Sequence, residues 1–486
     1  MKSAKMRIFC DISFLAALLF KVFSKGLTYF PILDDHIQYG GYPLYESLSH
    51  VYLNIGTIVT RPFAALLDPA VWGQFYPDLW VVLLSICVLF FFGIKLIADT
   101  FERTGIFITP FLYAIVLLIP LGFEGTYWIS ASSRICVGLF FSGVASALLV
   151  KMLTQNKKWL FLPYALATLL SFGFYESVMV MSAFLQFVVI VGFIKNNKKR
   201  LYYLLTPVLL GISMLVYYKL IAGISTLGSR VNTFEFSMLS ANIRELFTQF
   251  AEIIVDGGTK TTLFGAEEGI YLAIYSPLLA VGVIVISALC GYFGSKSPIV
   301  AKAKYCIPIG LGFMIFPLVP NLLTDTVWLT YRSIVPSLFG LVLISASILA
   351  PLLKNSRVRG IVIFLMVFIF MLGNLSELDT YKKVSEKDDV LVTYVSDKLD
   401  SDVLAGNKEA IVVVPEGLME PVPQVSYYKD HVKSVFDSDW ALTGAVRAKT
   451  RNIKIKMLTP MTETLFALSD TDPSVTQIIY IGGANE

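Results

Sequence analysis

The chain has 486 residues, of which 56% are hydrophobic, 14% aromatic and only 15% charged. Soluble globular proteins carry about 25% charged residues, so this composition excludes an ordinary soluble domain and indicates a polytopic membrane protein. The net charge of +4 is small for this length, and nucleic acid is not an expected partner. Five scattered cysteines and three histidines exclude a disulfide framework and a His-rich metal centre. No cofactor is expected, although a carboxylate-bound divalent ion remains open.

Eleven apolar stretches are long enough to cross a bilayer, whose hydrocarbon core of about 30 Å needs roughly 20 helical residues. Their approximate bounds are 8–31, 77–97, 105–122, 131–152, 159–175, 177–194, 201–222, 269–293, 304–322, 332–353 and 358–375. The run from 159 to 194 is too long for one ordinary span, and Glu176 marks a hairpin inside it. The sequence therefore predicts an α-helical protein with about eleven transmembrane helices.

The basic residues predict the orientation of these helices. If the N-terminus is cytoplasmic, most Lys and Arg residues fall in inner connections, as the positive-inside rule requires. The outer connections then carry only Arg61, Arg134, Arg230, Arg244, Lys260 and Arg332. Three further lysines, Lys21, Lys25 and Lys219, lie near outer helix ends, from which we expect their side chains to snorkel to the interface.

The C-terminal part of the chain differs in character from the rest. Residues 1–375 form the predicted transmembrane domain, with a first outer loop at about 32–76 and a later one at about 223–268. Residues 376–486 are polar, with short apolar runs such as 410–414 and 477–481, which predict a small α/β domain. An odd number of crossings places this domain outside the cytoplasm. There it would cover the membrane site, hold an acceptor, or serve only as a solubilising appendage.

Polar residues gather at the predicted outer face, and the pair Asp34-Asp35 comes first among them. Two carboxylates at a membrane boundary are costly without a partner or a function, so they are the first candidates for chemistry. The remaining candidates, for binding a substrate, are His36, Tyr127, Trp128, Arg134, Glu176, Tyr331 and Arg332. Carboxylates can take a proton from a hydroxyl, arginines can hold a phosphate and aromatic rings can stack on a sugar. The set suits a sugar-phosphate substrate.

This arrangement resembles the GT-C superfamily of integral-membrane glycosyltransferases. The shared features are a first helix ending at Asp34-Asp35, an amphipathic first outer loop from about 42 to 67, many further spans and an extracytoplasmic C-terminal domain. The Leu33-Asp34-Asp35 context is most similar to bacterial glucosyltransferases that decorate O-antigen or other surface polysaccharide.

The resemblance implies a reaction as well as a fold. It implies a hexose, glucose in these relatives, carried on a polyprenyl phosphate at the outer leaflet of the plasma (inner) membrane, and a surface glycan as acceptor. It further implies an inverting single displacement with one first-loop acid as the base. Asp34 is favoured slightly over Asp35 because it is closer to the helix end, and adjacent residues point in different directions.

Each candidate residue also has a structural interpretation. The acidic pair could mark a solvated helix end, and Glu176 could be solvated at the interface. Arg332 could pair with Asp325, and Arg134 with Glu124. Tyr127 and Trp128 could be interfacial anchors. His36 is expected to form a local hydrogen bond, with metal ligation as the minority alternative.

Three other function classes fit parts of the sequence. A transporter or lipid flippase would place charges at mid-membrane and contain broken helices or repeats, and no repeat is evident. A polysaccharide polymerase or ligase would carry key Arg and His residues in a late outer loop. A non-catalytic envelope assembly protein would tolerate loss of both aspartates.

Overall fold

A computed structural model describes residues 2–45, 47, 61–193, 198–222, 238–323, 327–417, 432–467, 469 and 476–482. The chain divides into two compact units, which are described separately here. The first, the helical unit, comprises Met1–Gly26, Leu53–Ala65 and Leu83–Glu377. The second, the sheet unit, comprises Leu27–Tyr52, Leu66–Val82 and Leu378–Glu486. Two segments of the predicted first outer loop therefore fold with the C-terminal part of the chain.

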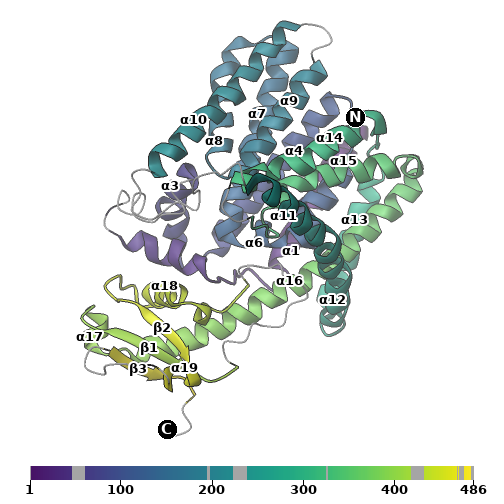
Figure 1. The fold of residues 1–486 in the computed structure, drawn as a ribbon. Coiled ribbons are helices and arrows are strands. Elements are labelled where there is room, and N and C mark those ends of the chain that lie inside the picture. The colour runs from purple at the N-terminus through teal and green to yellow at the C-terminus, as the bar shows by residue number, and fades with distance from the viewer. Residues whose placement is uncertain are drawn as a thin grey trace. The chain divides into compact units, whose positions relative to one another are not determined.

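Helices account for most of the described chain (Figure 1). The longer ones are α1 (Lys2–Phe23), α3 (Pro62–Ala70), α4 (Trp80–Arg103), α7 (Ile129–Gln155), α8 (Phe161–Phe172), α9 (Glu176–Phe193), α10 (Leu205–Ala222), α11 (Leu239–Glu252), α12 (Gly265–Ile274), α13 (Pro277–Gly294), α14 (Ala303–Ile315), α15 (Leu338–Leu349) and α16 (Ser356–Lys398). Helix α1 ends at Phe23, earlier than the end predicted at residue 31. Gly26, just beyond it, adopts a φ of 112°, which suits a helix C-terminus.

Seven helices in the described residues are long and apolar enough to cross a membrane. They match seven of the predicted spans, and the hairpin at Glu176 separates α8 from α9 as expected. Two other predicted spans correspond to the shorter apolar helices Lys158–Phe172 and Val335–Leu349. The predicted span at 105–122 is instead a pair of short helices, Thr109–Leu117 and Pro120–Tyr127, bent by 56°. Proline at 120 explains the break, since it has no amide hydrogen to continue the helix.

Two buried side chains complete the hydrogen bonding at this break. The ammonium of Lys21 donates to the carbonyl of Leu117 (3.0 Å), and the amide nitrogen of Asn374 donates to the carbonyl of Leu118 (2.6 Å). Lys21 also donates to Thr126 Oγ1 (2.8 Å) and is only 1% exposed. The expectation that Lys21 snorkels to the interface is therefore wrong. The broken span exposes carbonyls inside the bundle, and the buried lysine satisfies one of them.

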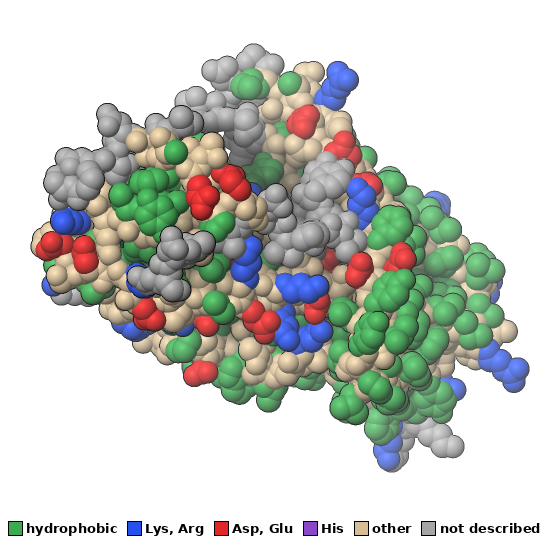
Figure 2. Space-filling model, turned by 90° about the horizontal axis from the view of Figure 1, so that it is seen from below, with side chains coloured by type: hydrophobic (Ala, Val, Ile, Leu, Met, Phe, Trp, Pro, Cys, Tyr) green, Lys and Arg blue, Asp and Glu red, His purple; other side chains and the backbone are tan. Residues whose placement is uncertain are grey.

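The helical unit carries a large apolar surface, part of which is visible in Figure 2. On α13 alone, Leu278, Val281, Ile284, Val285 and Leu289 are all exposed. A soluble protein would not leave whole helix faces of this kind in water, so the helical unit is suited to a lipid bilayer.

The sheet unit is built around three parallel strands, which confirms the predicted small α/β fold (Figure 1). They are β1 (Glu409–Val414), β2 (Leu458–Thr462) and β3 (Thr476–Tyr480), in the order β2-β1-β3. Helix α18 (Asp439–Thr450) and the last turns of α16 supply buried side chains to the same core as the strands. Most side chains of the central strand β1 are buried, as expected for a parallel strand that is covered on both faces.

The segment after α1 packs directly against this α/β fold. Residues His36–Gly41 form a π-helix, η1, which lies against α18. The contact is close: a Cβ on Gly40 would lie 2.4 Å from the Cβ of Ala448, and one on Gly444 would lie 2.2 Å from the side chain of Ile37. Glycine is required at both positions because no side chain fits between the two helices.

Substitution Gly40→Ala tests this docking. We expect it to lower stability by about 1–3 kcal/mol through overpacking against Ala448. The double variant Gly40→Ala/Ala448→Gly should recover most of the loss. Gly192→Ala is the control, because its nearest neighbour would be 3.5 Å away. Thermal unfolding in detergent gives the measurement, and equal effects of Gly40→Ala and Gly192→Ala would contradict the packing.

Candidate functional site

The acidic pair lies in the sheet unit, in a turn anchored by the residue before it. Leu33 has a φ of 38°, a left-handed conformation that is unfavourable for leucine. Its side chain is 4% exposed and belongs to the hydrophobic core formed by α16, α18 and the strands. Burial of Leu33 thus holds a strained turn in place. This turn fixes the positions of Asp34 and Asp35.

The two carboxylates of the pair have different environments. Asp35 is 0% exposed, and its Oδ2 accepts hydrogen bonds from Tyr29 Oη (2.5 Å) and from the amide of Ile32 (3.1 Å). Asp34 is partly exposed, and no hydrogen bond or ion pair joins its carboxylate to any described residue. Asp35 therefore closes the turn, whereas the Asp34 carboxylate is accessible to a ligand.

His36 lies beside a tyrosine from another segment of the same unit. Its Nδ1 is 3.4 Å from Tyr76 Oη. Desolvation lowers the pKa of His36 to about 4, with Lys449 adding to the shift and Asp389 opposing it. Desolvation also raises the pKa of Tyr76 to about 12. Both groups are neutral near pH 7, so His36 is suited to a local hydrogen bond.

A second group of predicted residues lies in the helical unit, where the break brings them together. The short helix α6 (Phe123–Tyr127) follows Pro120, and a Cβ on its Gly125 would lie 3.0 Å from Cα of Arg332. The Arg332 guanidinium lies over the ring of Trp128, 5.2 Å from its centroid. The contact is a cation–π interaction that leaves Arg332 partly exposed.

The other members of this group are buried. Tyr127, Trp128 and Tyr331 are at most 1% exposed, and the Tyr331 ring packs onto Gly257, where a Cβ would be 2.6 Å from its hydroxyl. Glu124 and Arg134 are 2% and 7% exposed. Both ionisable groups lie inside the helical unit, which is a costly position for charges. Asp325, a possible partner of Arg332, lies outside the described residues.

Glu176 is already paired. Both of its carboxylate oxygens lie 3.1 Å from Nε of Arg61, whose guanidinium also lies over the ring of Tyr175 at 4.6 Å. Sequence reasoning did not identify Arg61 as this partner, although it is one of the few arginines assigned to an outer connection. The pair ties the start of α3 to the α8–α9 hairpin.

The nine predicted site residues thus divide between the two units. Asp34, Asp35 and His36 belong to the sheet unit, and the remaining six belong to the helical unit. The first group offers an accessible carboxylate that can take a proton. The second offers an arginine on an aromatic ring, which can hold an anion. Among the described residues, no group of three or more His, Cys, Asp or Glu side chains is arranged to hold a metal ion.

Comparison of the chain with models of protein families, with curated proteins and with solved structures gives no match.

The difference between the two aspartates is testable by thermal unfolding. We expect Asp35→Asn to cost about 1.5–3 kcal/mol, because it weakens two hydrogen bonds to a buried charge. Asp34→Asn should change stability by no more than about 0.5 kcal/mol. Equal losses in the two variants would show that Asp34 is structural as well.

The Arg61–Glu176 pair can be measured with a double-mutant cycle using Arg61→Met and Glu176→Gln. Because both side chains are 24% exposed, we expect a coupling energy of about 1–3 kcal/mol. The exposed Lys382–Glu386 pair is the control, with an expected coupling of about 0.3–0.5 kcal/mol. A coupling at Arg61–Glu176 as small as the control would mean that the pair does not hold the loop.

Proposed function

We propose that this protein is a membrane glycosyltransferase of the GT-C type. It transfers a hexose, glucose by the resemblance above, from a polyprenyl-phosphate donor to a cell-surface glycan at the outer side of the plasma membrane. The observation that carries the proposal is the division of roles at the acidic pair. Asp35 is buried and fixes the turn, while Asp34 presents a partly exposed carboxylate in the same turn, which lies beyond the end of α1 at Phe23 and not at the helix end that the sequence predicts.

In this proposal Asp34 is the general base of an inverting displacement. The acceptor hydroxyl oxygen attacks C1 of the donor sugar from the face opposite the phosphate, and Asp34 takes the hydroxyl proton. The bond between C1 and the phosphate oxygen breaks, and the lipid phosphate leaves with the electron pair. Asp35 acts through Asp34 as a positioning residue, because it holds the turn that presents the base.

The sheet unit combines early and late segments of the chain, and this supports the proposed topology. A compact folded unit cannot have a bilayer passing through it, so residues 27–52 and 378–486 lie on the same side. The chain must then cross the membrane an even number of times between them. The structure has seven candidate spans, or eight with the bent pair; if the two shorter apolar helices also cross, the number is ten, and a crossing by α1 would make the predicted eleven. With the N-terminus in the cytoplasm, the C-terminal domain is extracytoplasmic.

Arg332 and Trp128 support the donor part of the proposal. The Arg332 guanidinium lies over the Trp128 ring and is partly exposed, and a guanidinium is a side chain that can bind a phosphate through two parallel N–H groups. A guanidinium of this kind can stabilise a phosphate group as it gains charge. We expect Arg332→Gln to lose affinity for the donor selectively, and a donor-binding assay tests this.

A transporter or flippase for lipid-linked glycans is the second candidate, and one observation favours it. The span at 109–127 is broken, and Lys21 and Glu124 are buried beside the break. Discontinuous helices with buried charges are typical of substrate sites in transporters. This candidate predicts movement of a lipid-linked glycan across the bilayer without sugar transfer.

The deciding experiment is transfer of labelled sugar from a polyprenyl-phosphate donor in membranes. We expect Asp34→Asn to lower the turnover rate about 10²–10⁴-fold with donor binding retained, because it removes the general base. Asp78→Asn is the matched control, because Asp78 is an exposed acid of the same sheet unit and this variant should transfer normally. Wild-type rates in Asp34→Asn would remove it from the mechanism. Flipping without transfer by the wild-type protein would favour the transporter.

A further inference from the structure

A groove of about 690 Å³ lies between α8 and α10, two neighbouring helices of the helical unit (Figure 1). The short helices that precede them, η7 (Lys158–Leu160) and η9 (Lys198–Leu204), supply Lys158 and Tyr202 to its lining. Most of the remaining wall is apolar and includes Phe161, Ala165, Leu205 and Leu209. The groove contains none of the residues that the sequence singled out for chemistry.

The two helices run in the same direction, and they meet beyond the groove. A Cβ on Gly211 of α10 would lie 4.0 Å from the ring of Phe172, the last residue of α8. The lining residues come from the first turns of both helices and from the segments just before them. The groove is therefore open at the end where α8 and α10 begin.

Aromatic side chains mark this open end as a membrane surface. Trp159 is 70% exposed and Tyr202 is 51% exposed, and both lie beside Lys158 at the start of the groove. Tryptophan and tyrosine are enriched at the level of the lipid head groups. Further along the groove, Leu205 and Leu209 are each 59% exposed, as suits a wall that faces hydrocarbon chains.

The connections at this end of the helices are strongly basic in sequence. Residues 151–160 and 194–204 contain no Asp or Glu. Their basic residues are Lys151, Lys157, Lys158, Lys195, Lys198, Lys199 and Arg200. The positive-inside rule predicts that both connections face the cytoplasm, where the membrane leaflet carries anionic lipids that attract such residues.

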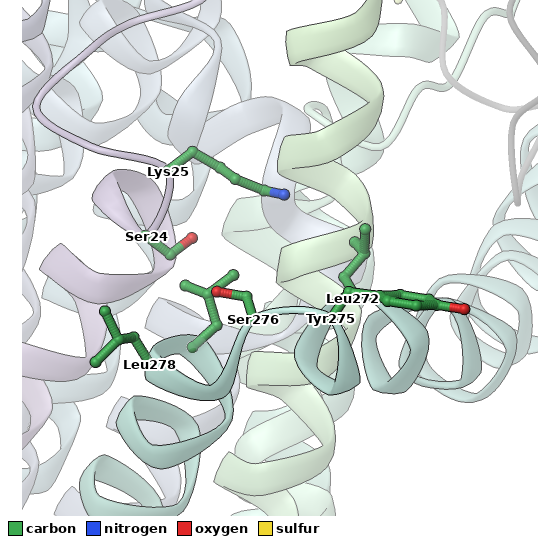
Figure 3. A pocket seen from close by; sticks show the side chains of 7 residues that line it. Ser24, Lys25, Leu272, Tyr275, Ser276 and Leu278 are labelled. Carbon is green, nitrogen blue, oxygen red and sulfur yellow. The ribbon is translucent and has the colours of Figure 1, made fainter.

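A second cavity, of about 420 Å³, lies at the end of α1 on the predicted outer side and differs in charge (Figure 3). Its lining includes a single basic side chain, Lys25, together with residues of the α12–α13 junction. Helix α12 also carries Glu267 and Glu268 in its first turn. That cavity lacks a basic surround, so Lys25 provides a matched control for Lys158.

The two parts of the α8–α10 groove match the two parts of an anionic phospholipid. An acyl chain would cover the apolar wall, and a negatively charged head group would lie at the basic opening beside Lys158. A small free anion would leave the apolar wall uncovered. A second copy of the chain, packed symmetrically on the groove, would bring the same basic connections together and be repelled.

We propose that the α8–α10 groove binds an anionic phospholipid of the cytoplasmic leaflet, with an acyl chain between the helices and Lys158 contacting the head-group phosphate. This site goes beyond the proposed function, because the bound lipid is neither the sugar donor nor the acceptor. A lipid that binds only the folded protein also stabilises it, so anionic lipid should raise the unfolding temperature.

Native mass spectrometry of the full-length protein in detergent measures this binding. The protein is titrated with dioleoyl-phosphatidylglycerol and, in parallel, with dioleoyl-phosphatidylcholine, which has the same chains and no net charge. We expect phosphatidylglycerol to bind more tightly, with about fivefold weaker binding in Lys158→Gln and recovery in Lys158→Arg. Lys25→Gln should bind both lipids as the wild type does.

A groove-filling variant tests the apolar part of the site. The larger side chain in Ala165→Phe would occupy the space of the acyl chain, and we expect it to abolish the tightest phosphatidylglycerol binding. Leu166→Phe is the control, because Leu166 is an exposed residue of the same helix outside the groove. Thermal unfolding without added lipid shows whether both variants are folded alike.

Three results would overturn the proposal. Equal affinities for the two lipids would rule out selection of an anionic head group. Unchanged phosphatidylglycerol binding in both Lys158→Gln and Ala165→Phe would place the lipid elsewhere. A dimer that Ala165→Phe dissociates would show that a second copy of the chain covers the groove. Because no sugar transfer is measured, this proposal and the glycosyltransferase proposal can fail independently.

Discussion

Burial of Leu33 in the core of the C-terminal α/β fold is the contact on which the proposed chemistry depends. It ties the turn after the first helix to strands and helices more than 350 residues later in the chain. The tight fit of η1 against α18, through Gly40 and Gly444, extends that contact. The C-terminal α/β fold thus packs directly against the segment that carries the acidic pair. A catalytic base on a mobile loop would lack the fixed geometry that proton transfer needs.

The helical unit shows a second constraint, which comes from the bilayer. A helix broken at Pro120 frees carbonyl groups that lipid cannot hydrogen-bond. Lys21 and Asn374, from α1 and α16, supply the missing donors. The break in turn positions α6 against Arg332 and Trp128. A bent, polar region inside the bundle suits an enzyme that admits a charged lipid head group and equally suits a transporter, so assays of function have to separate them.

The membrane class, most of the spans, the hairpin at Glu176 and the C-terminal strands could be predicted from the sequence. Each depends on hydropathy over a short window, which is a local property. The bent span was missed because residues 105–122 have enough apolar character for a continuous helix, and the effect of Pro120 depends on whether neighbours can satisfy the freed carbonyls. Lys21 was placed at the interface for a similar reason. A sequence window shows a lysine near a helix end but not the acceptors that approach it from other helices.

The sequence by itself determined that this is a polytopic membrane protein with an acidic pair after its first apolar segment and a small α/β fold at its C-terminus. These features follow from composition and hydrophobic periodicity, which can be read from short stretches of the sequence. Only the tertiary structure decided that Asp35 is buried and bonded while Asp34 is accessible, that Glu176 pairs with Arg61, and that Lys158, Ala165 and Tyr202 line one groove. Those distinctions depend on contacts between residues far apart in the chain, and such contacts exist only after the helices have packed.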